Sequence, residues 1–87
     1  MAYEIRFAPA ARRQFRKLPA EAQRRITRRI DALVCDPRPA GAKRLRGVAA
    51  LWRIRAGTYR IVYTISEEAV EVLVVRVAHR RDVYRSL

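Results

Sequence analysis

Arginine dominates the charged residues of this chain. Eighteen of the 87 residues are arginine and two are lysine, and the formal net charge is +12 at pH 7. No Asp or Glu occurs between Pro37 and Ser66, although six arginines lie in that stretch. A solvated surface normally mixes both signs, so this segment predicts a ligand that supplies negative charge. Because guanidinium groups grip phosphate with two parallel hydrogen bonds and stack on bases, the pattern indicates a protein that handles nucleic acid. A GC-rich coding sequence would also favour arginine over lysine, but it does not explain where the acids lie.

Three of these arginines flank a predicted β-hairpin. Ala56-Gly57 is a two-residue connection with glycine, as a tight hairpin requires, and counting outward from it places Arg53 opposite Arg60. Strand alternation then gives Arg53, Arg55 and Arg60 one face of the sheet. Like charges across strands are destabilising, which favours a phosphate between Arg53 and Arg60. The alternative is a solvated basic face with the guanidinium groups splayed apart. The same alternation turns the apolar residues of both strands to the core: Trp52, Ile54, Tyr59, Ile61 and Tyr63.

Two further groups of residues are candidates for contact with a ligand. A predicted helix carries four arginines on one face, which either track a phosphate backbone or are simply solvated: Arg24, Arg25, Arg28 and Arg29. His79 adjoins Arg80, Arg81 and Tyr84 in the tail, and this segment could fold back beside the hairpin arginines. His79 could equally be a solvated tail histidine.

Length and composition limit the other possibilities. A chain of 87 residues predicts a single domain, residues 1–87, with a thin core. Cys35 is the only cysteine, so we expect no internal disulfide, a reducing compartment and a small buried side chain near a helix end. One His and one Cys make a metal site built by the protein implausible, and no cofactor is predicted. No apolar run approaches the length of a signal sequence or membrane span, so we expect a cytoplasmic location without membrane contact.

Hydrophobic periodicity predicts an α+β fold. Tyr3 to Phe7 alternate as a short strand, Pro9 opens a helix, and Ala20 to Val34 form a second helix. Asp36 to Gly41 form a loop. Three strands follow, at residues 50–55, 58–65 and 70–77. The predicted fold is therefore an N-terminal strand, a two-helix hairpin and a three-stranded antiparallel meander, forming one small sheet with the helices on one face.

The chain resembles the RelE/ParE toxin superfamily over almost its full length. The resemblance rests on six segments in order, each degenerate alone: Ala11-Arg-Arg with Leu18-Pro19, Asp36-Pro37, Leu45-Arg46-Gly47, Trp52-Arg-Ile-Arg55, Gly57-Thr-Tyr-Arg60-Ile-Val-Tyr63 and Val77-Ala-His-Arg-Arg-Asp-Val-Tyr84-Arg85. It implies a toxin that is neutralised by an antitoxin, and the net charge favours an acidic one. The superfamily includes ribosome-dependent mRNA endonucleases and gyrase inhibitors on one fold.

The resemblance to the RelE-type nucleases also implies site residues. Arg53, Arg55 and Arg60 match basic positions of the second and third strands, Arg80 an arginine ending the last strand, Tyr84 a tail tyrosine and Arg46 a further basic position. These residues suit metal-free RNA cleavage, with arginines stabilising the charged phosphorane. We expect Arg60, Arg80, Tyr84 and His79 in catalysis, and Arg46, Arg53, Arg55 and Arg81 on RNA phosphates.

One departure bears on the proton transfer. In the best-known RelE-type site, the positions of Arg53 and Arg55 are lysines, which can act as bases, whereas arginine stays protonated. Proton transfer is therefore left to Tyr84 or His79. The preferred function is an mRNA endoribonuclease acting on the ribosome. The alternative is a ParE-like gyrase inhibitor without nuclease activity, and a plain RNA-binding module has no recognisable motif in its support.

Overall fold

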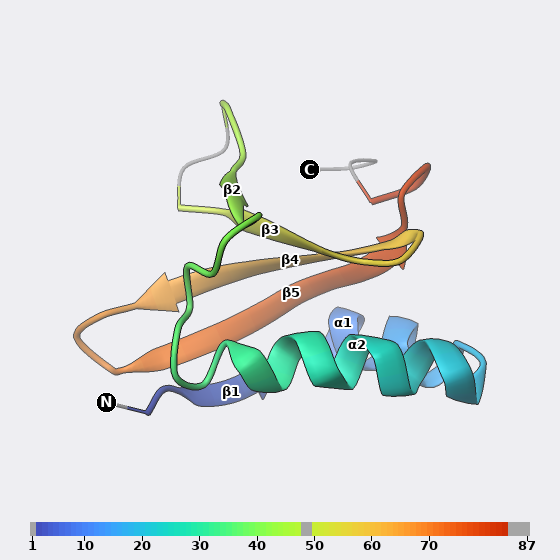
Figure 1. Ribbon diagram of the computed structural model, residues 1–87, viewed down its shortest axis with the longest axis horizontal. Coiled ribbons are helices and arrows are strands. Elements are labelled where there is room, and N and C mark those ends of the chain that lie inside the picture. The colour runs from blue at the N-terminus through green and yellow to red at the C-terminus, as the bar shows by residue number, and fades with distance from the viewer. Residues whose placement is uncertain (1, 48–49, 84–87) are drawn as a thin grey trace.

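The protein is a single five-stranded sheet with a helical pair on one side. The computed structural model describes residues 2–47 and 50–83. Its elements are β1 (Glu4–Phe7), α1 (Pro9–Arg16), α2 (Ala20–Ala32), β2 (Lys43–Arg44), β3 (Trp52–Ala56), β4 (Tyr59–Ser66) and β5 (Glu71–His79). The strand order is β1-β5-β4-β3-β2, and only the β1–β5 pair is parallel. Figure 1 shows α1 and α2 along the same side of the sheet, while the segment after β5 turns toward the other side.

This architecture confirms the predicted α+β class and adds one strand. β2 has two residues, which pair with Arg53 and Trp52 of β3. A strand this short has no periodicity to detect, so no strand was predicted at these residues. Within the described residues, no helix is long and apolar enough to cross a membrane.

The core lies between the helices and the inner face of the sheet. Ile26, Ile30 and Leu33 follow the helical spacing of one stripe and are almost fully buried. They meet inward-facing residues of the three central strands, which are also inaccessible to solvent: Ile54, Ile61, Tyr63, Val72, Val74 and Val77. Tyr63 is fully buried, whereas Trp52 and Tyr59 pack against this cluster as half-buried residues. The sequence assignment of these three aromatic residues to the core is confirmed.

A β-bulge and a side-chain amide complete the pairing of β5. The register with β4 shifts between Val62 and Tyr63, because Val62 pairs with Arg76 whereas Tyr63 pairs with Val74. A bulge increases the local twist of the strand. On the other edge of β5, the pairing with β1 ends at Val74. The Val77 N–H beyond it donates to Oε1 of Gln14 on α1 (2.8 Å), which satisfies a backbone group that would otherwise lack a partner.

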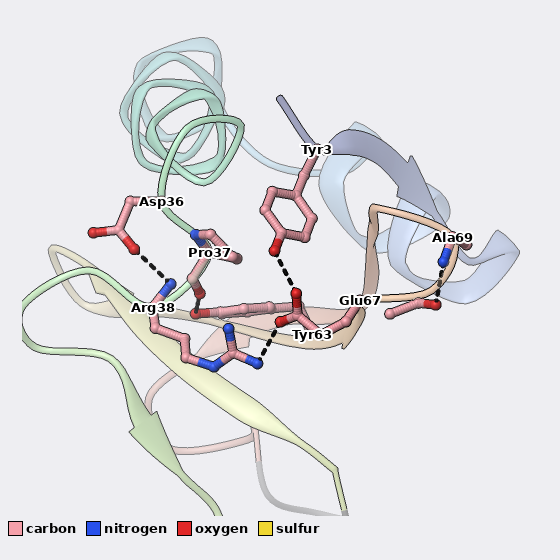
Figure 2. Close-up of polar contacts among 8 residues, drawn as sticks. Tyr3, Asp36, Pro37, Arg38, Tyr63, Glu67 and Ala69 are labelled. Atoms are coloured by element: carbon pink, nitrogen blue, oxygen red, sulfur yellow. Dashed lines mark hydrogen bonds and ion pairs between the residues drawn. The ribbon is translucent and has the colours of Figure 1, made fainter. Parts of the chain in front are cut away.

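A polar cluster ties the N-terminus, the loop after α2 and the β4–β5 turn together (Figure 2). The Tyr3 hydroxyl donates to Oε2 of Glu67 (2.6 Å), and Arg38 Nη2 lies 2.7 Å from Oε1 of the same carboxylate. The Arg38 guanidinium also sits 5.4 Å from the ring centroid of Trp52. In the same region, the hydroxyl of the buried Tyr63 donates to the Pro37 carbonyl (2.7 Å). Burial raises the pKa of Tyr63 to about 12. The chain therefore enters β2 from a loop that is held at several points.

Cys35 differs from its expected burial. α2 ends at Ala32, and residues 33–35 form a turn in which Leu33 faces the core and Cys35 faces solvent. The helical stripe therefore stops before the cysteine, and its side chain is not part of the core.

Glu67 is expected to contribute to acid stability. The hydrogen bonds from Tyr3 and Arg38 lower the pKa of Glu67, so its ionised form is favoured in the folded state. Its contribution is complete above the unfolded Glu value of about 4.3 and is lost as pH falls through the lower folded pKa. Glu67→Gln should therefore lower the melting temperature slightly at pH 7, because exposed ion pairs contribute little, and flatten the acid limb below about pH 5. Glu68→Gln, at an exposed neighbour in the same turn, is the control in thermal melts across pH. An identical pH dependence for Glu67→Gln and wild type would contradict this role.

Candidate nucleic-acid interface

The β3–β4 hairpin has a register different from the one predicted. Its turn residues are Gly57 and Thr58 rather than Ala56 and Gly57, and Arg60 pairs with Arg55 rather than Arg53. The predicted Arg53–Arg60 pair is therefore wrong. Gly57 adopts a φ of +64° at this turn, a conformation that glycine tolerates without strain. Because every partner shifts by two residues, each side chain keeps its predicted face.

Four arginines lie on the sheet face opposite the helices. We call Arg53, Arg55, Arg60 and Arg76 the arginine face. Arg55 and Arg60 are direct partners on β3 and β4. Two residues along the strands, on the same face, a second row of paired residues crosses β2, β3, β4 and β5. This row consists of Lys43, Arg53, Val62 and Arg76. Paired residues share a face, so cations from four strands are gathered on one surface.

Arg76 is a member that sequence reasoning missed. The segment from residue 70 to 77 was treated as a nearly unbroken apolar strand, and its two charged residues, Glu71 and Arg76, were passed over. A lone arginine inside a run of valines was the available signal, because a charged residue is rarely buried without a partner.

The centre of the arginine face is shielded from solvent to an extent that is unusual for charged groups. Arg53 is only 7% exposed, and Val62 between Arg53 and Arg76 is completely buried. The Nε atoms of Arg53 and Arg76 are buried and have no hydrogen-bond partner among the described residues. A buried donor without an acceptor costs about 1–3 kcal/mol, which an oxygen-rich anion could offset.

Arg60 is held by the hairpin turn that precedes it. Its Nη1 donates to the carbonyl oxygens of Gly57 (2.9 Å) and Tyr59 (3.0 Å). These bonds fix the guanidinium near the tip of the hairpin. Less side-chain entropy is then lost when this group binds a ligand.

The segment after β5 returns to the same region. The Arg80 N–H donates to the Thr58 carbonyl (2.8 Å), which places Arg80 beside the hairpin tip. Val83 is fully buried, and Arg76 Nη2 lies 3.4 Å from the Asp82 carbonyl oxygen. Arg76, a member of the arginine face, therefore also contacts the segment that carries Arg80. The next residue of that segment, Arg81, is exposed.

The structure places His79 on the side of the sheet opposite the arginine face. His79 pairs with Tyr59 of β4, and their rings meet edge to face with centroids 6.0 Å apart. Tyr59 packs against the helix-side core, so the imidazole lies on the helix side of the sheet. Its Nδ1 accepts a bond from the Arg81 N–H (3.3 Å).

Two further predicted residues are Arg46 and Tyr84. Arg46 is exposed in the loop after β2. Tyr84 lies outside the described residues. In the described part of the chain, no three His, Cys, Asp or Glu side chains come together as a group that could hold a metal.

Comparison with known proteins gives consistent relatives. Residues 5–84 match the family model described as the ParE toxin of the type II toxin–antitoxin system parDE. The chain is 36% identical to the toxin RelG of Mycobacterium tuberculosis, over 98% of this chain and 99% of RelG. It is 32% identical to the mRNA interferase toxin RelE of Escherichia coli K12, over 92% of this chain and 85% of RelE.

A solved structure shows the same fold. The chain superposes with a TM-score of 0.81 and 34% identity on a chain of the toxin–antitoxin complex RelBE2 from Mycobacterium tuberculosis. The match covers 92% of this chain and all of that one. The predicted fold is confirmed at this level.

Removal of the buried charge should stabilise the fold. Arg53→Met keeps much of the apolar stem and removes a donor that lacks an acceptor, so the free energy of unfolding should rise by about 1–3 kcal/mol. Inorganic phosphate should raise the melting temperature of wild type more than that of the variant. Arg12→Met, at an exposed position of α1, is the control in urea and thermal unfolding. A loss of stability in Arg53→Met would instead assign Arg53 a structural role.

Proposed function

Because this chain belongs to the RelE/ParE superfamily of type II toxins, we propose that it inhibits translation by cleaving mRNA. Cleavage takes place on the ribosome, in the cytoplasm. The observation that carries this proposal is the arginine face, where the strand register places four arginines on one face of the sheet and two Nε atoms lack acceptors within the described residues. A relative 32% identical to this chain is named an mRNA interferase, which supports the same activity.

The proposed reaction is an internal transesterification of RNA. The 2′-oxygen loses its proton to a base and bonds to the adjacent phosphorus, and the bond from phosphorus to the 5′-oxygen breaks. The departing 5′-oxygen takes a proton, which leaves a 2′,3′-cyclic phosphate and a free 5′-hydroxyl. In this scheme Arg60 and Arg80 stabilise the charge that develops on the phosphorane oxygens. Arg53 and Arg55 hold the phosphate, and Arg46 and Arg81 contact neighbouring phosphates. No metal ion takes part in these steps.

An antitoxin is the second proposed partner. A relative in the solved complex from Mycobacterium tuberculosis is bound to its antitoxin, and we infer a cognate antitoxin for this chain. The net charge of +12 favours an acidic one, because complementary charge accelerates association.

Gyrase inhibition remains the alternative, since the matching family model is described as a ParE toxin. A gyrase inhibitor would bind a protein and leave RNA intact. The arginine face favours the nuclease, because its chemistry suits a reacting phosphate.

Cleavage should depend on Arg60 rather than on net charge. Arg60→Ala should reduce cleavage by about a hundredfold or more, as for loss of one transition-state donor. Arg12→Ala removes the same charge from an exposed site on α1 and should cleave like wild type. Primer extension on mRNA after brief expression measures both. Discrete cuts support the nuclease, whereas intact mRNA with stalled replication would support gyrase inhibition.

Proton transfer should depend on Tyr84 more than on His79. The family resemblance supports Tyr84, and His79 faces the helix side beside Tyr59. Tyr84→Phe should therefore slow single-turnover cleavage far more than His79→Ala, and the wild-type rate should keep rising into alkaline pH. If the rate instead levels off near the usual His value of about 6.5, and His79→Ala removes this plateau, His79 is the base.

A further inference from the structure

A second basic site lies at the edge of β3, next to α2. A hollow of about 580 Å³ opens between this helix and the hairpin tip, a size typical of ligand sites. We call it the α2–β3 hollow, and it is lined by Arg25, Arg28, Arg29, Arg55, Ala56 and Gly57. All the charged residues of this lining are arginines.

The edge of β3 explains how one wall of the hollow forms. β2 covers β3 only at Trp52 and Arg53, so this edge is open nearer the hairpin tip. The Arg55 carbonyl accepts a bond from Nε of Arg29 (2.9 Å). This bond fixes α2 against the strand and uses one of the three guanidinium nitrogens.

Gly57 explains how the opposite wall forms. A Cβ at this position would collide with Nη1 of Arg25, so the guanidinium lies against the hairpin tip where glycine has no side chain. Arg25 also lies 3.9 Å from Glu21, but both side chains are exposed. An exposed pair of this kind contributes little and leaves the hollow strongly basic.

Arg55 links the hollow to the arginine face. Arg55 belongs to both, because it pairs with Arg60 on the face opposite the helices and also lines the hollow. A single carboxylate would need only one of these surfaces. An extended polyanion could follow both, and guanidinium groups match phosphate oxygens with two parallel bonds.

We propose that the α2–β3 hollow binds backbone phosphates of RNA that flank the phosphate held on the arginine face. This inference rests on the proposed function, since it takes RNA as the ligand. The helix arginines then extend the RNA path and contribute affinity, while the chemistry stays on the arginine face.

The test measures RNA binding without cleavage. The probe is a labelled single-stranded RNA with 2′-O-methyl groups throughout, because it lacks the 2′-hydroxyl that the reaction requires. The variant is Arg25→Ala/Arg28→Ala, which keeps the bond from Arg29 to the strand. The control is Arg12→Ala/Arg13→Ala, which removes the same charge from exposed positions of α1. Thermal melts confirm that both variants fold.

The salt dependence of binding gives the decisive number. In the hollow variant, the slope of log K against log salt should become shallower by about 0.7 for each phosphate that the protein no longer neutralises. In the control, the slope should stay at the wild-type value. Across oligonucleotides of about 4 to 16 residues, the decrease in affinity should appear only in the longer ones, which reach beyond the arginine face.

Three outcomes would overturn the proposal. The first is a hollow variant with the wild-type slope, and the second is an equal change in the α1 control. The third is unchanged RNA binding together with failure to associate with the purified antitoxin, which would make the hollow a protein interface. Failure of the proposed function is distinguishable, because wild type would then leave mRNA intact in cells whatever the slopes show.

Discussion

The two-residue repeat of β3 and β4 is the constraint on which the rest of the structure depends. Ile54 and Ile61 are direct partners and fully buried against the helices. Once these residues face the core, alternation sends the neighbouring arginines to the other side of the sheet. A slip of one residue would bury the arginines and expose the isoleucines. Burial of the apolar face thus places like charges together, and the arginine face follows from the same pattern as the core.

Arg53 is the most buried member of the arginine face. Arg53 is almost excluded from solvent beside Val62, and desolvation of a charged group is unfavourable without acceptors. The polar cluster at the other end of the sheet has the opposite character, because the Glu67 carboxylate there accepts bonds from Tyr3 and Arg38. The fold therefore contains one end where a carboxylate is paired with its neighbours and one surface where the buried Nε atoms of Arg53 and Arg76 have no hydrogen-bond partner among the described residues. Strain of this kind is characteristic of functional sites.

α2 contributes both to the hydrophobic core and to the α2–β3 hollow. Its apolar stripe, with Ile26 and Ile30, is buried against the sheet, and Arg25, Arg28 and Arg29 line the hollow beside the hairpin. The sequence predicted the stripe and the arginine cluster from helical spacing, but it left the role of the arginines open between phosphate contact and solvation. The α2 arginines lie near the β3 edge because of how the helix packs. Helical spacing in the sequence shows which residues share a face of the helix, but not which element that face lies against.

The sequence by itself determined the order of the elements other than β2, the core face of β3 and β4, and the basic character of the opposite face of this hairpin. These features follow from local periodicity, because apolar and polar residues that alternate along a strand point to opposite faces of the sheet. Only the tertiary structure decided that Arg60 meets Arg55 rather than Arg53, because the partner depends on which two residues form the turn. It also brought Arg76 into the row beside Arg53 and placed His79 on the helix side, on a β5 strand whose pairing with β4 contains a bulge. Turn position and bulges change cross-strand partners without altering the composition of a strand, and for that physical reason they are not visible in the residue pattern.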